Sequence, residues 1–432
     1  VYGGFVSHAG AGDATGNTVT ITGGSMKDVY AGYTAGTGKT TGNTVNLGDG
    51  TNAMASGTSI TGTLAGGNQA TATDNTLNVN TNAVVGNIKN FAKISFKLDG
   101  AVNASDALLK LTGGATTGLD WAGVDVTPAN YTFTPKTYEK RLFTLMENAA
   151  GISFMKNGDN TYSPLGAKER TSGGKYEYVI DTDNHSVNAT RYVYVDGFRF
   201  KDNQAAYTAA DGSHTEAWAG RTAVGNKVEG NALKVEGGTL TAAAYGGLVE
   251  NNKLTAGGQP LTTGDAEKNT LTVTGGSVAD GYGAKVTTKD GAAKTNTAEI
   301  SSGAVTGSLY GGALTKAGAT GSATGNTVTI TGGTMKDVYG GYTNGTGQAT
   351  GNTVTIGDGT NALPSGTQIA GYLYGGNKAV DTGNKLVVNT AVSVKNIKHF
   401  EKLSFNLSHI SNATTPLLTL TDGVQTGGLD WD

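Results

Sequence analysis

Few residues in this chain have the types and spacing that chemistry requires, and each candidate also has a plainer structural interpretation. Asp181 and Asp183 alternate along an expected strand, which would place their carboxylates ~6–7 Å apart on one face. That spacing suits glycoside or calcium chemistry, although turn-forming surface acids are the commoner use of such residues. The five histidines share no metal-ligand spacing, so we expect solvated loop residues rather than a zinc site.

Motifs for phosphate binding and for nucleophilic catalysis are incomplete. Thr37-Gly38-Lys39-Thr40 resembles the end of a phosphate loop, but Tyr33 stands where the pattern requires Gly. The Gly-Asp-Gly sequences around Asp49 and Asp358 lack calcium-repeat spacing and indicate turns. The chain has no cysteine, and no Gly-x-Ser-x-Gly elbow occurs. We therefore expect no metal, no cofactor and no enzymatic activity.

Composition favours turn-rich β structure. The 432 residues include 69 Gly and only 6 Pro, and charged residues make up 15%, against ~25% in typical soluble domains. The net charge is −3 and no basic stripe occurs, so nucleic acid is not an expected partner. No apolar run approaches the ~20 residues of a membrane span, and the N-terminus has no signal-peptide pattern. The chain opens and stops in mid-pattern, so targeting or anchoring elements are expected outside it.

Long-range self-similarity organises the sequence. Gly16–Tyr30 returns as Gly325–Tyr339 with a single change, and further matches place the start of a second module of roughly 308 residues near Leu309. We therefore divide the chain into a repeat array over 1–121, a non-repetitive segment over 122–216, a second array over 217–308 and the start of a second module copy over 309–432.

A shorter unit lies inside the module. One half is Gly-Asn followed by alternating polar and apolar residues, as at Gly16, and the other is an aromatic followed by Gly-Gly or a near equivalent, as at Tyr310. Successive aromatic positions lie 28 to 37 residues apart, which suits one coil of a stacked β solenoid. Period-two alternation predicts that the apolar residues point inward and the Thr residues outward. The inward set is Val19, Ile21, Val328 and Ile330, and the outward set is Thr18, Thr20, Thr327 and Thr329.

The Asn of each unit predicts a ladder. Stacked coils place equivalent amides above one another, so each side chain can bond to the next along a buried corner. The residues concerned are Asn17, Asn43, Asn326, Asn352 and Asn384.

These reiterated units resemble the passenger regions of large bacterial autotransporter adhesins, as in Gly325–Thr343. The resemblance covers about three quarters of the chain and includes no catalytic motif. It implies an all-β fold, a right-handed parallel β-helix, that is exported and attached to the outer membrane of the bacterial cell surface. It also implies an extracellular structural or adhesive role.

The segment 122–216 differs in texture from the arrays. It holds 8 of the 69 Gly but 8 of the 18 Tyr and 5 of the 10 Phe. Alternation over Tyr176–Ile180 and Arg191–Phe200 predicts antiparallel strands with a turn through Asp183–His185. The segment either spaces the coils, with its aromatics in a core, or protrudes and binds a ligand, because Tyr and Arg dominate recognition hot spots. The candidate contact residues are Tyr176, Tyr178, Arg191, Tyr192, Tyr194 and Arg199.

Three functions from different classes remain open at this stage. The first is a rigid stalk that presents binding regions to a host-cell, matrix or bacterial surface protein or glycan. The second is a building block of self-associating surface filaments. The third is a polysaccharide-degrading enzyme, which would need acids and bases clustered across neighbouring coils.

Overall fold

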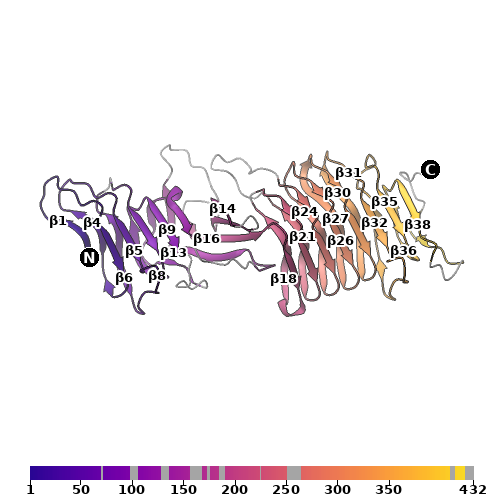
Figure 1. Ribbon diagram of the computed structural model, residues 1–432, viewed down its shortest axis with the longest axis horizontal. Coiled ribbons are helices and arrows are strands. Elements are labelled where there is room, and N and C mark those ends of the chain that lie inside the picture. The colour runs from indigo at the N-terminus through magenta and orange to yellow at the C-terminus, as the bar shows by residue number, and fades with distance from the viewer. Residues whose placement is uncertain are drawn as a thin grey trace.

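The protein is elongated and built almost wholly of β-strands. The computed structural model describes residues 1–69, 72–97, 106–127, 136–155, 168–172, 176–183, 190–223, 225–250, 264–408 and 414–423. Within these ranges the helical elements are two short 3₁₀ turns, η1 (Trp121–Gly123) and η2 (Ala209–Asp211). Figure 1 shows a group of short strands at each end of the molecule and long strands between them. The predicted all-β class with parallel sheets is confirmed.

The first array consists of the parallel strands within residues 2–127, in two sheets. One sheet contains β2 (Thr18–Ile21), β5 (Thr44–Leu47), β7 (Thr76–Val79), β9 (Lys93–Lys97) and β12 (Val124–Thr127). The other contains β1 (Tyr2–Val6), β3 (Ser25–Met26), β4 (Val29–Thr34), β6 (Ser59–Gly67), β8 (Ala83–Lys89), β10 (Leu109–Leu111) and β11 (Thr116–Asp120).

The second array consists of the parallel strands within residues 204–420, mostly in three sheets. The first sheet contains β17 (Gln204–Tyr207), β20 (Ala232–Val235), β23 (Thr270–Val273), β26 (Thr297–Ile300), β29 (Thr327–Ile330), β32 (Thr353–Ile356), β35 (Lys385–Val388) and β38 (Lys402–Phe405). The second contains β18 (Ser213–Thr222), β21 (Thr239–Val249), β24 (Ser277–Val286), β27 (Ala304–Ala319), β30 (Thr334–Gly345), β33 (Gln368–Ile369), β34 (Tyr372–Tyr374) and β37 (Asn396–Lys398). The third contains β19 (Val228–Glu229), β22 (Ala266–Glu267), β25 (Ala293–Lys294), β28 (Ala323–Thr324) and β31 (Ala349–Thr350). A separate pair joins β36 (Val392–Val394) to β39 (Leu418–Leu420).

From β17 to β31 the chain visits the three sheets of the second array in rotation, one strand in each. Each turn therefore has three strands, whereas the sequence pattern had indicated two. The third strand is only two residues long, as in Val228–Glu229, which is too short to show an alternating pattern. Strand β27 crosses the predicted boundary at residue 308 without a break, so 217–308 and 309–432 form one continuous array.

Alternation along the strands places the side chains as predicted. Val328 and Ile330 are fully buried, Val19 and Ile21 nearly so, and the Thr residues beside them are exposed or half-buried. Parallel pairing stacks equivalent residues, because Ile330 lies in register with Ile300 on one side and Ile356 on the other. Apolar columns of this kind form the core of the second array.

A ladder of asparagines runs along one corner of the second array. Each Nδ2 donates to the Oδ1 of the Asn in the next turn at 2.7–3.1 Å, and each backbone N–H donates to the same oxygen. The ladder contains Asn203, Asn231, Asn269, Asn296, Asn326, Asn352 and Asn384. A shorter ladder in the first array joins Asn17, Asn43 and Asn75. The predicted amide ladder is confirmed and is longer than the Gly-Asn motif had indicated.

Stacked tyrosines form a second ladder, in a cluster separate from the core of the second array. Ring centroids of successive residues lie 4.4–5.4 Å apart with interplanar angles of 2–22°. The ladder contains Tyr245, Tyr282, Tyr310, Tyr339 and Tyr374. Burial raises the pKa of Tyr310 to about 12. Since each ring covers the face of the next, the ladder has a packing role and offers no free ring faces along its length.

Antiparallel strands separate the two arrays. They are β13 (Arg141–Met155), β14 (Lys168–Ser172), β15 (Tyr176–Thr182) and β16 (Thr190–Arg199), which we call the antiparallel segment. Strand β13 pairs in parallel with β10 and antiparallel with β16, and β15 pairs antiparallel with β16 as predicted. The break in the parallel order is therefore narrower than residues 122–216, since β12, β17 and β18 belong to parallel sheets.

The antiparallel segment packs against both arrays. Ile180 and Val195 belong to the core of the first array, whereas Val179 and Phe198 on the opposite face pack against Ala223 of the second. The buried carboxylate of Glu177 accepts hydrogen bonds from the Thr222 hydroxyl at 2.7 Å, the Ala223 N–H at 3.0 Å and the Asn226 amide at 2.7 Å. These contacts fasten the segment to the start of the second array.

Candidate functional site

The six predicted contact residues lie on β15 and β16, but the structure divides them. Tyr178 and Tyr194 are each only 4% exposed, so the prediction of ligand contact is corrected at these two positions. Tyr178 packs in the core of the first array, and Tyr194 lies beneath the side chain of Arg141. The Arg141 guanidinium lies 3.4 Å from the ring centroid of Tyr194, and burial raises the pKa of this phenol to about 12.

Neither Arg199 nor Tyr176 is shown as an accessible contact residue by the described part of the chain. Arg199 is half-buried, and its buried Nε has no hydrogen-bond partner among the described residues. Tyr176 begins β15, opposite Arg199, and the position of its side chain lies outside the described part of the chain. The accessible members are therefore Arg191 and Tyr192.

Asp183 positions these two residues at the start of β16. Its carboxylate accepts hydrogen bonds from the backbone N–H groups of Arg191 and Tyr192, both at 3.2 Å, and from the Thr190 hydroxyl. Burial raises the pKa of Asp183, but these hydrogen bonds outweigh it, so the net pKa lies below the ordinary value. Asp181 is fully buried and accepts from the Thr182 N–H. The two carboxylates thus have separate structural roles and do not form the paired site considered from the sequence.

Four strands bring one row of outward side chains together beside Tyr192. Lys110 on β10 lies in register with Val84 on β8 and with Glu147 on β13, and Glu147 lies in register with Tyr192 on β16. A Glu147 carboxylate oxygen lies 3.4 Å from Arg191 Nη2, and the other oxygen lies 3.9 Å from Lys110 Nζ. The Arg191 guanidinium lies 4.9 Å from the Tyr192 ring centroid. The row is a parallel-sheet feature that continues into the antiparallel segment.

A hollow of about 370 Å³ opens over this row, and we call it the junction hollow. Besides the row itself it is lined by Asn82, Asp106 and Thr144. Val84 is 48% exposed, although most Val residues of the arrays are buried. The hollow presents an aromatic ring, an aliphatic surface, carboxylates, an ammonium and an amide. Such a lining suits a ligand that forms hydrogen bonds and has apolar faces. Sequence reasoning found Arg191 and Tyr192 but missed Lys110 and Glu147, because strand register brings these residues together across 82 positions of chain.

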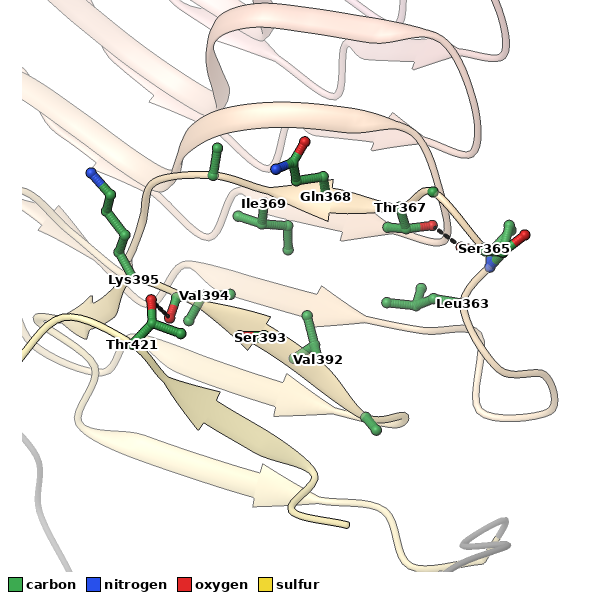
Figure 2. Close-up of a pocket in the computed structure, with 14 residues that line it drawn as sticks. Leu363, Ser365, Thr367, Gln368, Ile369, Val392, Ser393, Val394, Lys395 and Thr421 are labelled. Carbon is green, nitrogen blue, oxygen red and sulfur yellow. Dashed lines mark hydrogen bonds between the residues drawn. The ribbon is translucent and has the colours of Figure 1, made fainter.

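A larger hollow of about 600 Å³ lies in the second array, between β33 and β36 (Figure 2). Figure 2 shows Lys395 and Thr421 at one end of it and Leu363 and Ser365 at the other, with Ile369 and Val392 between them. No sequence pattern indicated this hollow, which we call the β33–β36 groove.

No group of three or more His, Cys, Asp or Glu residues within the described ranges could hold a metal ion. None of the helices among those residues has the length and apolar character to cross a membrane. No protein-family model, curated protein or solved structure matches this chain.

Proposed function

We propose that this chain is a non-catalytic, extracellular part of a bacterial cell-surface protein, a stiff stalk that presents a binding region. The finer architecture that we propose is a right-handed parallel β-helix, attached to the outer membrane through a barrel or anchor outside this chain. The partner is a protein or glycan on a host cell, in the matrix or on another bacterium. The resemblance to autotransporter passengers supports this assignment.

The observation that best supports the stalk proposal is the unbroken ladder of seven asparagines. An identical hydrogen-bond arrangement repeated turn after turn fixes the stacking of each turn on the next. Stability in such arrays comes from each turn and its nearest neighbours, so the design extends in length without requiring a larger core. Length and stiffness are what a surface stalk needs.

The junction hollow supports the adhesive part of the proposal. The repeated strand faces present short Thr side chains, which offer little apolar area to a partner. Arg191 and Tyr192 combine rigid area with directional donors, and residues of these types supply much of the energy at recognition surfaces. They also stand where the parallel strands of the first array give way to the antiparallel segment.

The experiment is adhesion of beads coated with the chain to epithelial cells and to immobilised matrix proteins. Deleting the antiparallel segment is a poor test, because Ile180 and Val195 belong to the core of the first array. The double variant Arg191→Ala, Tyr192→Ala is better, with Lys336→Ala on an exposed position of the second array as its control. We expect coated beads to adhere, the double variant to lose about tenfold or more in adhesion, and the control to match the parent.

Two results would contradict the proposal. Adhesion no greater than that of albumin-coated beads on any surface removes the adhesive role. Equal adhesion by parent and double variant removes the junction hollow as the contact.

A further inference from the structure

The two module copies allow one pair of neighbouring strands to be compared in two settings. In the first copy, β6 and β8 are hydrogen-bonded neighbours, with Ile60 in register with Val85. The equivalent residues of the second copy, 309 positions later, are Ile369 on β33 and Val394 on β36. These two strands are not paired, and the β33–β36 groove occupies the space between them.

The closed arrangement of the first copy requires glycine at position 86. Gly86 lies so close to the preceding turn that an added Cβ would be 2.4 Å from the carbonyl oxygens of both Thr61 and Gly62. No side chain fits at that distance. The equivalent residue of the second copy is Lys395, whose N–H bonds to the Gly371 carbonyl at 3.0 Å. Because Lys395 carries a Cβ, its strand cannot approach β33 as β8 approaches β6, and the groove opens beside it.

The lining of the groove indicates what it can hold. Its floor and sides contain the aliphatic residues Ile369, Val392 and Val394. The side chains of Ser365, Gln368 and Ser393 line it without a hydrogen bond to another described residue. Lys395 is the one charged residue of the lining, and its ammonium forms no ion pair within the described ranges. The Lys395 ammonium lies 5.9 Å from the ring centroid of Tyr372. The groove therefore combines free hydroxyl and amide groups, apolar surface and, at its end, one cation without an ion pair.

We propose that the β33–β36 groove binds an extended oligosaccharide that carries an acidic group, with Lys395 contacting the carboxylate or sulfate. Sugar rings present hydroxyls at their edges and C–H groups on their faces, which matches free hydroxyl and amide side chains over an aliphatic floor. The alternative occupant is a peptide strand added to the edge of β33. That edge is only two residues long, whereas strand addition draws its affinity from a run of main-chain hydrogen bonds. The side chains thus favour the saccharide.

This site is separate from the junction hollow and goes beyond the proposed function. It also differs from the first copy of the module, where Gly86 closes the equivalent space. The lining itself also differs between the copies, because Gln368, Ser393 and Lys395 stand where the first copy has Ser59, Val84 and Gly86.

The test uses α-1,4-linked tetragalacturonate as the acidic probe and its fully methyl-esterified form as the neutral counterpart, with affinities from calorimetry. We expect the parent to bind the acidic probe about tenfold more tightly than the neutral one, because the ester cannot form the ion contact with Lys395. Lys395→Gln keeps the Cβ but removes the charge, so the preference should vanish while neutral binding remains. Lys395→Gly lets the strands close, so both probes should be lost.

The matched variants are Lys234→Gln, at an exposed lysine of β20 in another sheet, and Gly86→Lys in the first copy. The first should bind as the parent does. The second should add a site, provided that its thermal unfolding shows it folded. Amide chemical shifts of Ile369 and Ser393 on titration locate the ligand independently of any substitution.

Three outcomes would overturn the proposal: no binding of either probe by the parent, parental binding by Lys395→Gly, or amide shifts confined to other residues. Binding of an extended tetrapeptide without either saccharide would assign the groove to a peptide instead. Adhesion through Arg191 and Tyr192 is measured separately, so either proposal can fail while the other stands.

Discussion

The parallel arrays and the antiparallel segment satisfy their buried polar groups in different ways. The arrays mainly use neutral amides, the Asn ladders, in which each amide except the last bonds to a copy of itself in the next turn. The second array also buries Arg221, which pairs with Glu216 and Glu250. The antiparallel segment uses charge, since Glu177, Asp181 and Asp196 are all at most 1% exposed and all lie on β15 or β16. Among the described residues, the one other buried carboxylate is Asp381, at 7%.

The difference follows from repetition. A side chain that recurs in each turn can both donate and accept, so an amide is sufficient and no charge needs to be buried. A strand without copies must satisfy whatever donors it meets, and a carboxylate can accept several at once, as Glu177 does from Thr222, Ala223 and Asn226. A carboxylate that does not meet donors is costly. Asp196 is close to this case, because neither of its buried oxygens has a hydrogen-bond partner among the described residues, and its ion pairs with Arg141 and Lys140 are long, at 3.6 and 4.0 Å.

The largest effect is expected from a charge inside an array. Ile330→Asp places a carboxylate between Ile300 and Ile356, where no donor is available, and should lower the free energy of unfolding by about 3–5 kcal/mol. Thr329→Asp, one residue away on the outward face, should cost less than about 1 kcal/mol. Urea unfolding monitored by circular dichroism measures both. Equal losses for the two variants would remove the inward and outward distinction in the arrays.

The amide ladder should be nearly as sensitive as the apolar columns. Asn326→Leu removes the acceptor for both the backbone N–H and the Nδ2 of Asn296, both at 3.0 Å. Leaving these buried donors unsatisfied should cost about 2–4 kcal/mol. Asn17→Ala is the matched variant at a ladder end, where the side chain donates to Asn43 at 2.9 Å, and should cost about 1 kcal/mol. Similar losses at both positions would mean that the ladder does not act through paired amides.

Asp196 gives the antiparallel segment a pH response that neutral amides cannot give. Burial raises the pKa of this carboxyl group, although Lys140, Arg141 and Arg221 oppose the shift. With a folded pKa above the ordinary 3.8, its contribution to stability is full below that value and is lost as pH rises through the folded pKa. Asp196→Asn has no such loss. The free energy of unfolding of this variant, minus that of the parent, should therefore increase as pH rises from about 3.5 to about 7.

Asp49 is a control, because its pKa is shifted in the opposite direction and its contribution to stability should change with pH in the opposite sense. Hydrogen bonds from the backbone N–H and side chain of Asn52 and from the Thr51 N–H lower its pKa to about 2. Its contribution is therefore present above the ordinary value and lost as pH falls, so Asp49→Asn should be the less stable chain at neutral pH. A pH-independent difference for Asp196→Asn would show that the buried carboxylate is not the source of the response.

The repeated parts of the fold could be predicted because each unit confirms the next. Alternation gave the inward residues Val328 and Ile330, and five Gly-Asn pairs gave the ladder. The junction hollow could not be predicted in the same way. Lys110, Glu147 and Tyr192 meet only through strand register, and Tyr178 is buried because its face of β15 packs in the core of the first array. Local pattern carries no information about either.

The ladder also shows why the Gly-Asn motif missed some of its members. Asn75, Asn203, Asn269 and Asn296 follow Asp74, Asp202, Lys268 and Thr295, and these four residues have φ of 51–59°. The left-handed conformation before the Asn is thus the constant feature, and Gly is its commonest occupant, as at Gly325 with φ 64°. The sequence motif contained glycine because glycine adopts the left-handed conformation most easily. The fold requires that conformation and not glycine itself.

Because every turn has this left-handed residue at the same position, a residue that suits one turn can be exchanged with its equivalent in the next. The antiparallel segment has no equivalent positions and allows no such exchange. Thr295 is β-branched and holds φ 51°, a conformation that costs such residues about 1–2 kcal/mol. Thr295→Gly should remove that strain but increase the entropy of the unfolded chain, for a net gain of about 0.5–1 kcal/mol in the free energy of unfolding. The reciprocal change, Gly325→Thr in the next turn, should lose a similar amount. Thermal unfolding of both variants and of the double exchange measures this, because the exchange should return the stability to near that of the parent. A loss for Thr295→Gly would show that its hydroxyl, which donates to the Lys294 carbonyl at 2.8 Å, contributes more than the strain costs, and that turns are not interchangeable at this corner.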